Sequence, residues 1–151
     1  MVKIVPLQDT TVDAYFDEER SMFFVRYRGT LTSEATNRAY LWLLAAGGAV
    51  GLDHIRAFIF YFTAVQQFTR ENVVAAKKQS TQANALVDLS RIPAALIVKN
   101  FYQEQFVLLS MKANNVEERT RICHSQAEAL AFIEQFHIRQ RKTGHDPEIG
   151  S

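Results

Sequence analysis

The stretch Ile55-Arg-Ala-Phe-Ile-Phe-Tyr-Phe-Thr-Ala64 decides the fold of this chain. It is almost continuously apolar and rich in phenylalanine, and polar or glycine-containing segments flank it. A run of this kind is typical of a strand that is covered on both faces, as the central strands of parallel sheets are. Such a strand needs parallel neighbours and helices beside it, so the run predicts an α/β fold.

The residues before this run predict a hairpin followed by a helix. We expect a short edge strand over Thr11–Phe16 and a half-buried second strand that starts at Met22 and ends at Gly29, because its residues alternate with a period of two. Thr32-Ser-Glu34 is a helix-capping sequence. We expect Gly47-Gly48 to end this first helix, since glycine adopts the left-handed cap conformation at little cost.

The residues after the run predict three further helices and two further strands. Thr69 begins a second helix with a weak apolar face, and a third helix from about Tyr102 to Ala113 is apolar on more than one face. The remaining predicted elements are a strand at Ala94–Val98, a strand at Thr120–Cys123, and a last helix capped by Ser125 with the inner residues Ala129, Phe132, Ile133 and Phe136. The order ββαβαβαβα predicts a mixed sheet of about five strands that opens with an antiparallel hairpin and is flanked by four helices.

Length and composition indicate a single domain at residues 1–139 and a flexible, polar tail at residues 140–151. The formal net charge of +1 gives no general attraction to nucleic acid or to an anionic membrane. The single cysteine, Cys123, fits a reducing compartment, and no apolar stretch is long enough for a secretory signal or a membrane span. These features predict a cytoplasmic protein without nucleic-acid binding or stable membrane insertion.

Four segments together carry a family resemblance. They are Val25-Arg-Tyr-Arg-Gly-Thr-Leu-Thr-Ser-Glu34, Phe60–Thr69, Arg91–Val98 and Arg121–Ile133. Over about residues 11–137 the chain resembles the bacterial SpoIIAA-like proteins of the STAS group (sulphate transporter and anti-sigma factor antagonist domains). This resemblance implies a STAS-like fold and a module used for binding and regulation, not for catalysis.

The resemblance also directs attention to Thr69. In anti-sigma factor antagonists a serine or threonine at the start of the second helix is phosphorylated in an Asp-Ser-Ser-Gly-like setting, which releases the partner. Here the loop reads Gln66-Gln-Phe-Thr-Arg-Glu71, so Thr69 is the only hydroxyl at that place, and Tyr61 stands where many relatives have an aspartate. Phosphorylation of Thr69 would add about two negative charges at a helix N-terminus. We favour the alternative that Thr69 is a plain helix cap, which stabilises the fold by about 1 kcal/mol.

No sequence pattern indicates catalysis, a cofactor or a metal site. The chain has no Gly-x-Ser-x-Gly motif, and Gly47-Gly-Ala-Val-Gly51 lacks the Gly-Lys-Ser/Thr ending of a phosphate-binding loop. Cys123 and His124 are neighbours on a predicted strand and should point to opposite faces. His54 and His137 have no ligand spacing with another candidate. We therefore predict that the protein is not an enzyme.

Eleven phenylalanines and five tyrosines are many for a sheet of this size. A well-filled core would account for them, and so would two binding functions. The first is a protein-interaction surface for another protein or a second copy, formed by Phe68, Thr69, Asn100, Phe101 and Tyr102, where strands lead into helices. The alternative is a carrier or sensor of a small hydrophobic ligand, which requires an apolar cavity between the sheet and the second and third helices.

Overall fold

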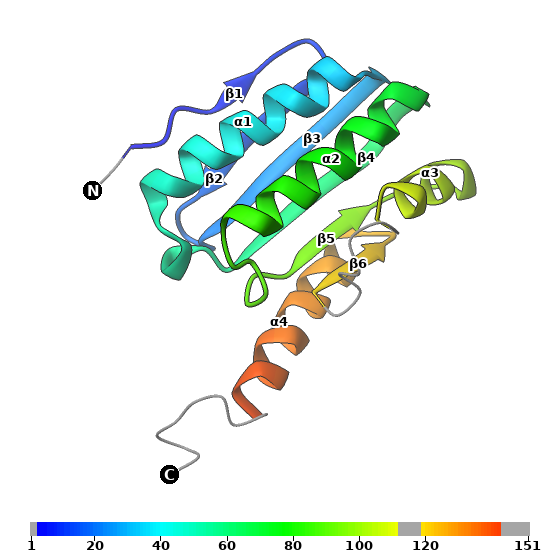
Figure 1. Ribbon diagram of the computed structural model, residues 1–151. Coiled ribbons are helices and arrows are strands. Elements are labelled where there is room, and N and C mark those ends of the chain that lie inside the picture. Colours follow the sequence, from blue (N-terminus) through cyan, green and yellow to red (C-terminus); the bar gives the residue numbers. More distant parts are fainter. Residues whose placement is uncertain (1–2, 112–118, 143–151) are drawn as a thin grey trace.

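The computed structural model describes residues 3–111 and 119–142 of the chain, and these form one mixed sheet with four α-helices (Figure 1). The strands are β1 (Leu7–Gln8), β2 (Val12–Asp17), β3 (Met22–Leu31), β4 (Ala57–Phe68), β5 (Ala94–Ile97) and β6 (Thr120–Cys123). The helices are α1 (Ser33–Val50), α2 (Arg70–Leu86), α3 (Phe101–Met111) and α4 (Gln126–Lys142), with the short 3-10 helix η1 (Leu52–His54) after α1. The predicted fold class is confirmed.

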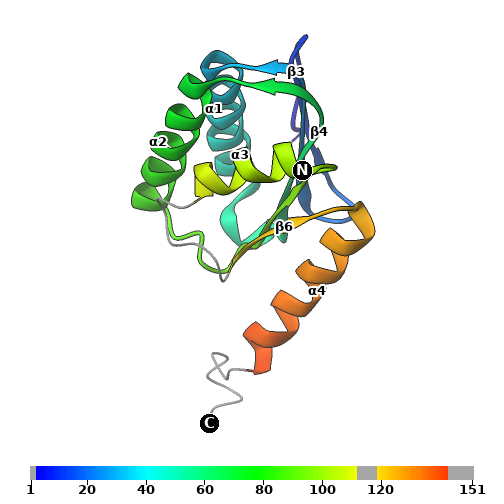
Figure 2. The same cartoon turned by 90° about the vertical axis from the view of Figure 1, so that its right-hand side faces the viewer.

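The six strands lie in the sheet in the same order as in the chain, β1-β2-β3-β4-β5-β6. Strands β1, β2 and β3 pair antiparallel, and β3 to β6 pair parallel. Three helical crossovers join the parallel strands: α1 joins β3 to β4, α2 joins β4 to β5, and α3 joins β5 to β6. Each crossover is right-handed and each moves one strand further in the same direction across the sheet, so α1, α2 and α3 lie on one face of the sheet. Helix α4 lies on the other face (Figure 2). The extra strand relative to the prediction is β1, whose two residues are too few to show a period.

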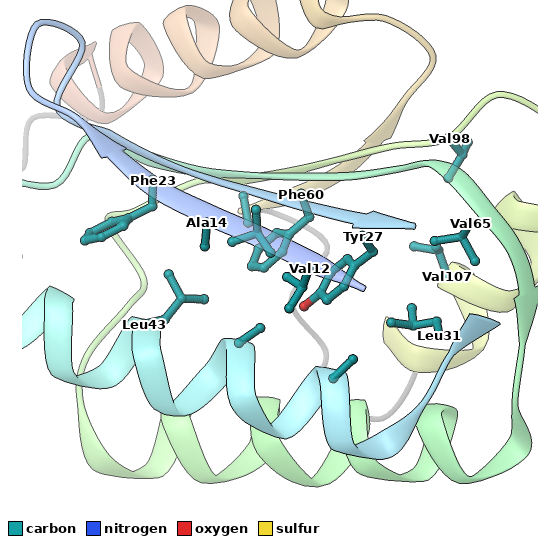
Figure 3. Packing of buried hydrophobic residues seen from close by; sticks show 14 of the residues in the cluster. Val12, Ala14, Phe23, Tyr27, Leu31, Leu43, Phe60, Val65, Val98 and Val107 are labelled. Atoms are coloured by element: carbon teal, nitrogen blue, oxygen red, sulfur yellow. The ribbon is translucent and has the colours of Figure 1, made fainter. Parts of the chain in front are cut away.

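The sheet separates two layers of core. On the side of α1 to α3, the buried side chains include Val12, Phe23, Val25, Tyr27, Leu31, Leu43, Phe60 and Val107 (Figure 3). On the side of α4 they include Met22, Phe24, Ile59, Ile97, Cys123 and the predicted inner residues Ala129, Phe132, Ile133 and Phe136. The first half of β3 is therefore buried on both faces, not half-buried as predicted, because α4 covers the second face.

Strand β4 is the longest strand and extends beyond β5. The pairing of β4 with β5 ends at Tyr61, whereas its pairing with β3 continues to Phe68. The register between β3 and β4 shifts on either side of the Arg28–Gly29 pair, and Gly29 has a φ of 71°. Gly29 thus occupies an irregularity inside β3 and does not end the strand, contrary to the prediction, since glycine takes a positive φ without strain.

Helix α1 continues through Gly47 and Gly48 and ends only before Gly51, which corrects the predicted helix end. Gly47 is buried, and a Cβ there would lie 3.8 Å from Ile55 Cδ1. Gly51 has a φ of 91° and its N–H donates to Gly47 O over 2.8 Å. Packing of the helix end against η1 and Ile55 therefore extends α1 by one turn.

The C-terminal boundaries also differ from the prediction. Helix α4 reaches Lys142, so the helix includes the first residues assigned to the tail. The rest of the predicted tail, residues 143–151, and the predicted end of the third helix at Ala113 lie outside the described residues. Within the described ranges, no helix combines the length and the apolar character needed to cross a membrane.

Two glycine substitutions test the end of α1. Gly48→Ala should raise the free energy of unfolding by about 0.5–1 kcal/mol, because alanine is the better helix former and a Cβ at Gly48 meets no atom within 4 Å. Gly51→Ala should lower it by about 1–3 kcal/mol, because a side chain is strained at this positive φ. Urea unfolding measures both. Equal stability of the wild type and Gly51→Ala would show that α1 ends elsewhere.

Candidate functional site

An apolar cavity of about 370 Å³ lies between the sheet and helices α1, α2 and α3. Its volume is near the lower end of the range for small-molecule sites, about 300–1,000 Å³. Apolar side chains from the sheet and three helices line it, among them Leu31, Leu43, Phe58, Phe60, Phe62, Phe68, Leu96 and Val107. The predicted cavity between the sheet and the second and third helices is therefore present, and α1 forms a further wall.

Small side chains on α2 leave this space open. Ala76, Ser80 and Ala83 of α2 line the cavity, and Asn72 is the buried residue of this helix. The weak apolar face predicted for the second helix is thus the face toward the sheet.

Polar contacts connect the N-terminal part of α1 with the first half and the middle of α2. The Thr36 hydroxyl donates to Asn72 Oδ1, and both side chains are buried. Gln79 Nε2 donates to Asn37 Oδ1 over 2.8 Å.

The cavity reaches the surface at the opposite ends of these helices. Leu44 and Gly48 of α1 and Asn84 of α2 line the cavity and are also exposed. The cavity therefore opens between the C-terminal halves of α1 and α2.

Three large polar side chains, those of Tyr27, Tyr40 and Arg119, are among the residues that line this mostly apolar space. Figure 3 shows Tyr27 pointing from the sheet toward the helices. Burial raises the pKa of Tyr27 well above its usual range, and the neighbouring Tyr40 adds to this shift. Burial also raises the pKa of Tyr40, against the effect of the nearby Arg119 guanidinium. Sequence reasoning missed all three residues.

The predicted interaction surface is only partly a surface. Phe68 and Tyr102 do come together: the Phe68 N–H donates to the Tyr102 hydroxyl over 3.2 Å, and the rings lie 5.8 Å apart in an edge-on arrangement. Phe68 is buried, however, and lines the cavity, which corrects its assignment as a surface residue. The remaining four residues, Thr69, Asn100, Phe101 and Tyr102, are named here the carboxyl-end surface; Phe101 is 74% exposed.

Two of these residues are helix caps. Thr69 Oγ1 accepts from the Asn72 N–H over 3.1 Å and donates to Leu31 O over 3.0 Å. Asn100 Oδ1 accepts from the Gln103 N–H over 2.9 Å at the start of α3. The Thr69 hydroxyl thus has the geometry of a plain N-cap, and a phosphate on it would break its bond to Leu31.

Gln103, which sequence reasoning also missed, fastens α3 to the protruding end of β4. Its side chain is fully buried. Its Nε2 donates to Val65 O over 2.9 Å and to Thr63 O over 3.3 Å, and its Oε1 accepts from the Lys99 N–H over 2.8 Å. These bonds satisfy backbone groups of β4 beyond the point where β5 ends. The sequence places two glutamines, Gln103 and Gln105, between the aromatic residues Tyr102 and Phe106, and no local pattern indicates which of them is buried.

The cysteine and histidine candidates are separated as expected. Cys123 is buried, and burial raises the pKa of its thiol to about 11. His124 is exposed, and its Nε2 lies 3.2 Å from Glu104 Oε1. His137 Nε2 lies 2.9 Å from Arg56 O. No group of three metal-ligating side chains occurs in the part of the chain that the structure describes.

Gln103→Ala should lower the free energy of unfolding by about 1–3 kcal/mol, because it leaves buried backbone groups without partners. Gln105→Ala is the matched control, since Gln105 lies on the same helix and is exposed; it should change stability by less than about 0.5 kcal/mol. Chemical denaturation of the two variants measures the difference. Similar losses for both would contradict an anchoring role of Gln103.

The comparisons with known proteins concern the fold. No family model matches the sequence, and no curated protein matches it. The crystal structure of an anti-sigma factor antagonist from Mycobacterium paratuberculosis is similar, with a TM-score of 0.53 and 14% sequence identity over 85% of this chain and 99% of that chain. At this identity the likeness establishes the fold alone: the chain has the mixed α/β fold of an anti-sigma factor antagonist.

Proposed function

We propose that the protein is a non-catalytic, STAS-like regulatory module that acts by binding another protein. The fold is that of a protein described as an anti-sigma factor antagonist. Because one fold serves many functions, the proposal depends on a site as well. The observation that carries it is the exposed aromatic pair Phe101 and Tyr102 at the carboxyl-end surface, which are 74% and 41% exposed.

The geometry of the carboxyl-end surface suits protein recognition. The Asn100 cap fixes the start of α3, and the Tyr102 hydroxyl is held by the Phe68 N–H. The Tyr102 ring also packs edge-on against Phe106, with ring centres 5.0 Å apart. Aromatic side chains positioned in this way supply contact area while losing little conformational freedom, and they are frequent at the energetic centres of interfaces.

The composition of the cavity supports a function without catalysis. Its described lining residues include no histidine, cysteine, aspartate or glutamate, the side chains that most often act as general acids and bases. The thiol of Cys123 is buried in the opposite core layer with its pKa raised to about 11, so it is a poor nucleophile near neutral pH.

Replacing Phe101 and Tyr102 by serine tests the proposed surface. The amount of partner protein captured by the double variant should be lower than that captured by the wild type by a factor of about ten or more. The reason is that the loss of central aromatic contacts costs about 2 kcal/mol or more of binding free energy. Quantitative mass spectrometry of proteins captured from lysate of the natural host measures this retention. Leu41→Ser is the control, since Leu41 is an exposed residue of α1 away from this surface. Unchanged capture by a folded double variant would reject the surface.

The cavity favours a second function, that of a carrier or sensor of a small hydrophobic ligand. Pockets of this size, apolar with a few polar groups, are the usual form of small-molecule sites. The opening between α1 and α2 is lined by Leu44, Gly48 and Asn84 and offers a path for entry. The small residues of α2 are what keep the space open.

Ala83→Phe should block this cavity, whereas Ala85→Phe should not. Ala83 lines the cavity, and Ala85 is an exposed residue of the same helix. The uncharged fluorescent probe N-phenyl-1-naphthylamine should bind the wild type and Ala85→Phe with similar affinity, and Ala83→Phe at least about tenfold more weakly, because the phenyl ring would occupy the apolar space that the probe needs. Absence of binding to the wild type, or equal binding by all three proteins, would reject the ligand function.

A further inference from the structure

We propose that the cavity binds a single-chain amphiphile with an anionic head, and that Arg119, Tyr40 and Tyr27 hold the head. This inference rests on the second candidate function, the binding of a hydrophobic ligand, and it assigns the chemical class of that ligand. The cavity, and the one arginine and two tyrosines among its described lining residues, lead to the assignment.

Arg119 is the central observation. It immediately precedes β6 and lines the cavity. Its Nε donates to Ile92 O over 2.7 Å, which fixes the side chain and leaves the two terminal amino groups of the guanidinium for other partners. No aspartate or glutamate among the described residues forms an ion pair with it. Arg119 is half-buried, and a cation that is partly withdrawn from water loses solvation unless a counter-charge replaces it. An anionic ligand head would supply this counter-charge.

The two phenols complete an environment suited to an anion. Tyr27, Tyr40 and Arg119 line the same cavity. Burial raises the pKa of Tyr40 against the lowering effect of the Arg119 guanidinium, and burial together with Tyr40 raises the pKa of Tyr27. Burial keeps both phenols protonated, which makes them O–H donors near neutral pH. The Tyr40 ring is stacked on Phe60 with ring centres 6.5 Å apart, which holds it against the sheet. Donors to a charged acceptor form stronger hydrogen bonds than neutral pairs do.

The rest of the cavity fits an alkyl chain. Apart from these groups and the polar pair Thr36–Asn72, its walls are mostly apolar side chains and glycines. A volume of about 370 Å³ near the lower limit for ligand sites favours one chain over the two of a diacyl lipid. The ligand therefore has a single alkyl chain and one anionic head.

Competition against bound N-phenyl-1-naphthylamine tests the inference with three ligands that share one alkyl chain. Decanoate should displace the probe at a concentration about tenfold or more below that of decanol, because it adds charge-assisted hydrogen bonds. Decylammonium should be the weakest, since its charge is repelled by Arg119. Equal affinity of decanoate and decanol would overturn the anionic head and leave the cavity proposal standing. Failure of all three to displace the probe would overturn both proposals.

Two variants locate the head. In Arg119→Met the preference for decanoate over decanol should disappear, and continued displacement of the probe by decanol shows that the cavity remains folded. In Tyr40→Phe the preference should fall but persist. A preference for decanoate that survives Arg119→Met unchanged would show that the head lies elsewhere and would overturn the assignment.

Decyl phosphate distinguishes two sources of the same chemistry. Tighter binding of decanoate identifies a carboxylate head, as in a fatty acid, and tighter binding of decyl phosphate identifies a phosphate head, as in a lysophospholipid. Both results support the inference, provided that the anion binds more tightly than decanol. Weaker binding of both anions than of decanol would overturn it.

Discussion

The burial of β4 on both faces is the constraint on which the rest of the structure depends. Phe58 and Phe60 face the layer of α1 to α3, and Ile59 and Tyr61 face the layer of α4. The strand pairs with β3 on one side and β5 on the other. A strand of this composition is stable only when helices cover both of its faces, so its burial requires both helical layers.

The sequential strand order then determines how these layers are filled. Three crossovers in one direction place α1, α2 and α3 on one face and leave the other to α4 (Figure 2). Strands β3 and β4 extend beyond β5, and the long helices α1 and α2 cover them. Because α2 presents alanine and serine to the sheet, this layer encloses space that its side chains do not fill. The cavity is thus a consequence of a long sheet covered by a helix with small inner residues.

Both candidate sites meet at Phe68. Its ring is stacked on Phe106 with ring centres 5.1 Å apart, and it also contacts the ring of Tyr102 at the carboxyl-end surface. The same side chain lines the cavity. The interaction surface and the ligand cavity are therefore in direct contact through one residue, which makes the two proposed functions compatible within one regulatory module.

Local patterns in the sequence predicted the elements that have a clear period and the residues that cap them. Strand β6 and the inner residues of α4 are confirmed, and so is the cap at Thr69. The predicted end of α1 was wrong because the packing of the helix against Ile55 outweighs the helix-breaking tendency of Gly47.

The predicted candidate site was less complete than the fold. Phe68, Thr69 and Tyr102 were proposed because they stand where strands lead into helices. Tyr27 comes from β3, Tyr40 from α1, and Arg119 from the residue before β6. Their convergence on one cavity follows only from the three-dimensional sheet. The fully buried Gln103 looks like any polar helix residue until the end of β4 is placed beside it.

The most direct test of the central claim, that this fold encloses a ligand-sized apolar cavity on the α1–α3 face of its sheet, is to map a bound ligand by NMR. Backbone amide shifts of isotope-labelled protein would be followed during titration with decanol. The account predicts that the shifts concentrate in the C-terminal halves of α1 and α2 and in β4, while amides of α4 are unchanged. Shifts confined to α4 or to the carboxyl-end surface, or no shifts at saturating decanol, would contradict it.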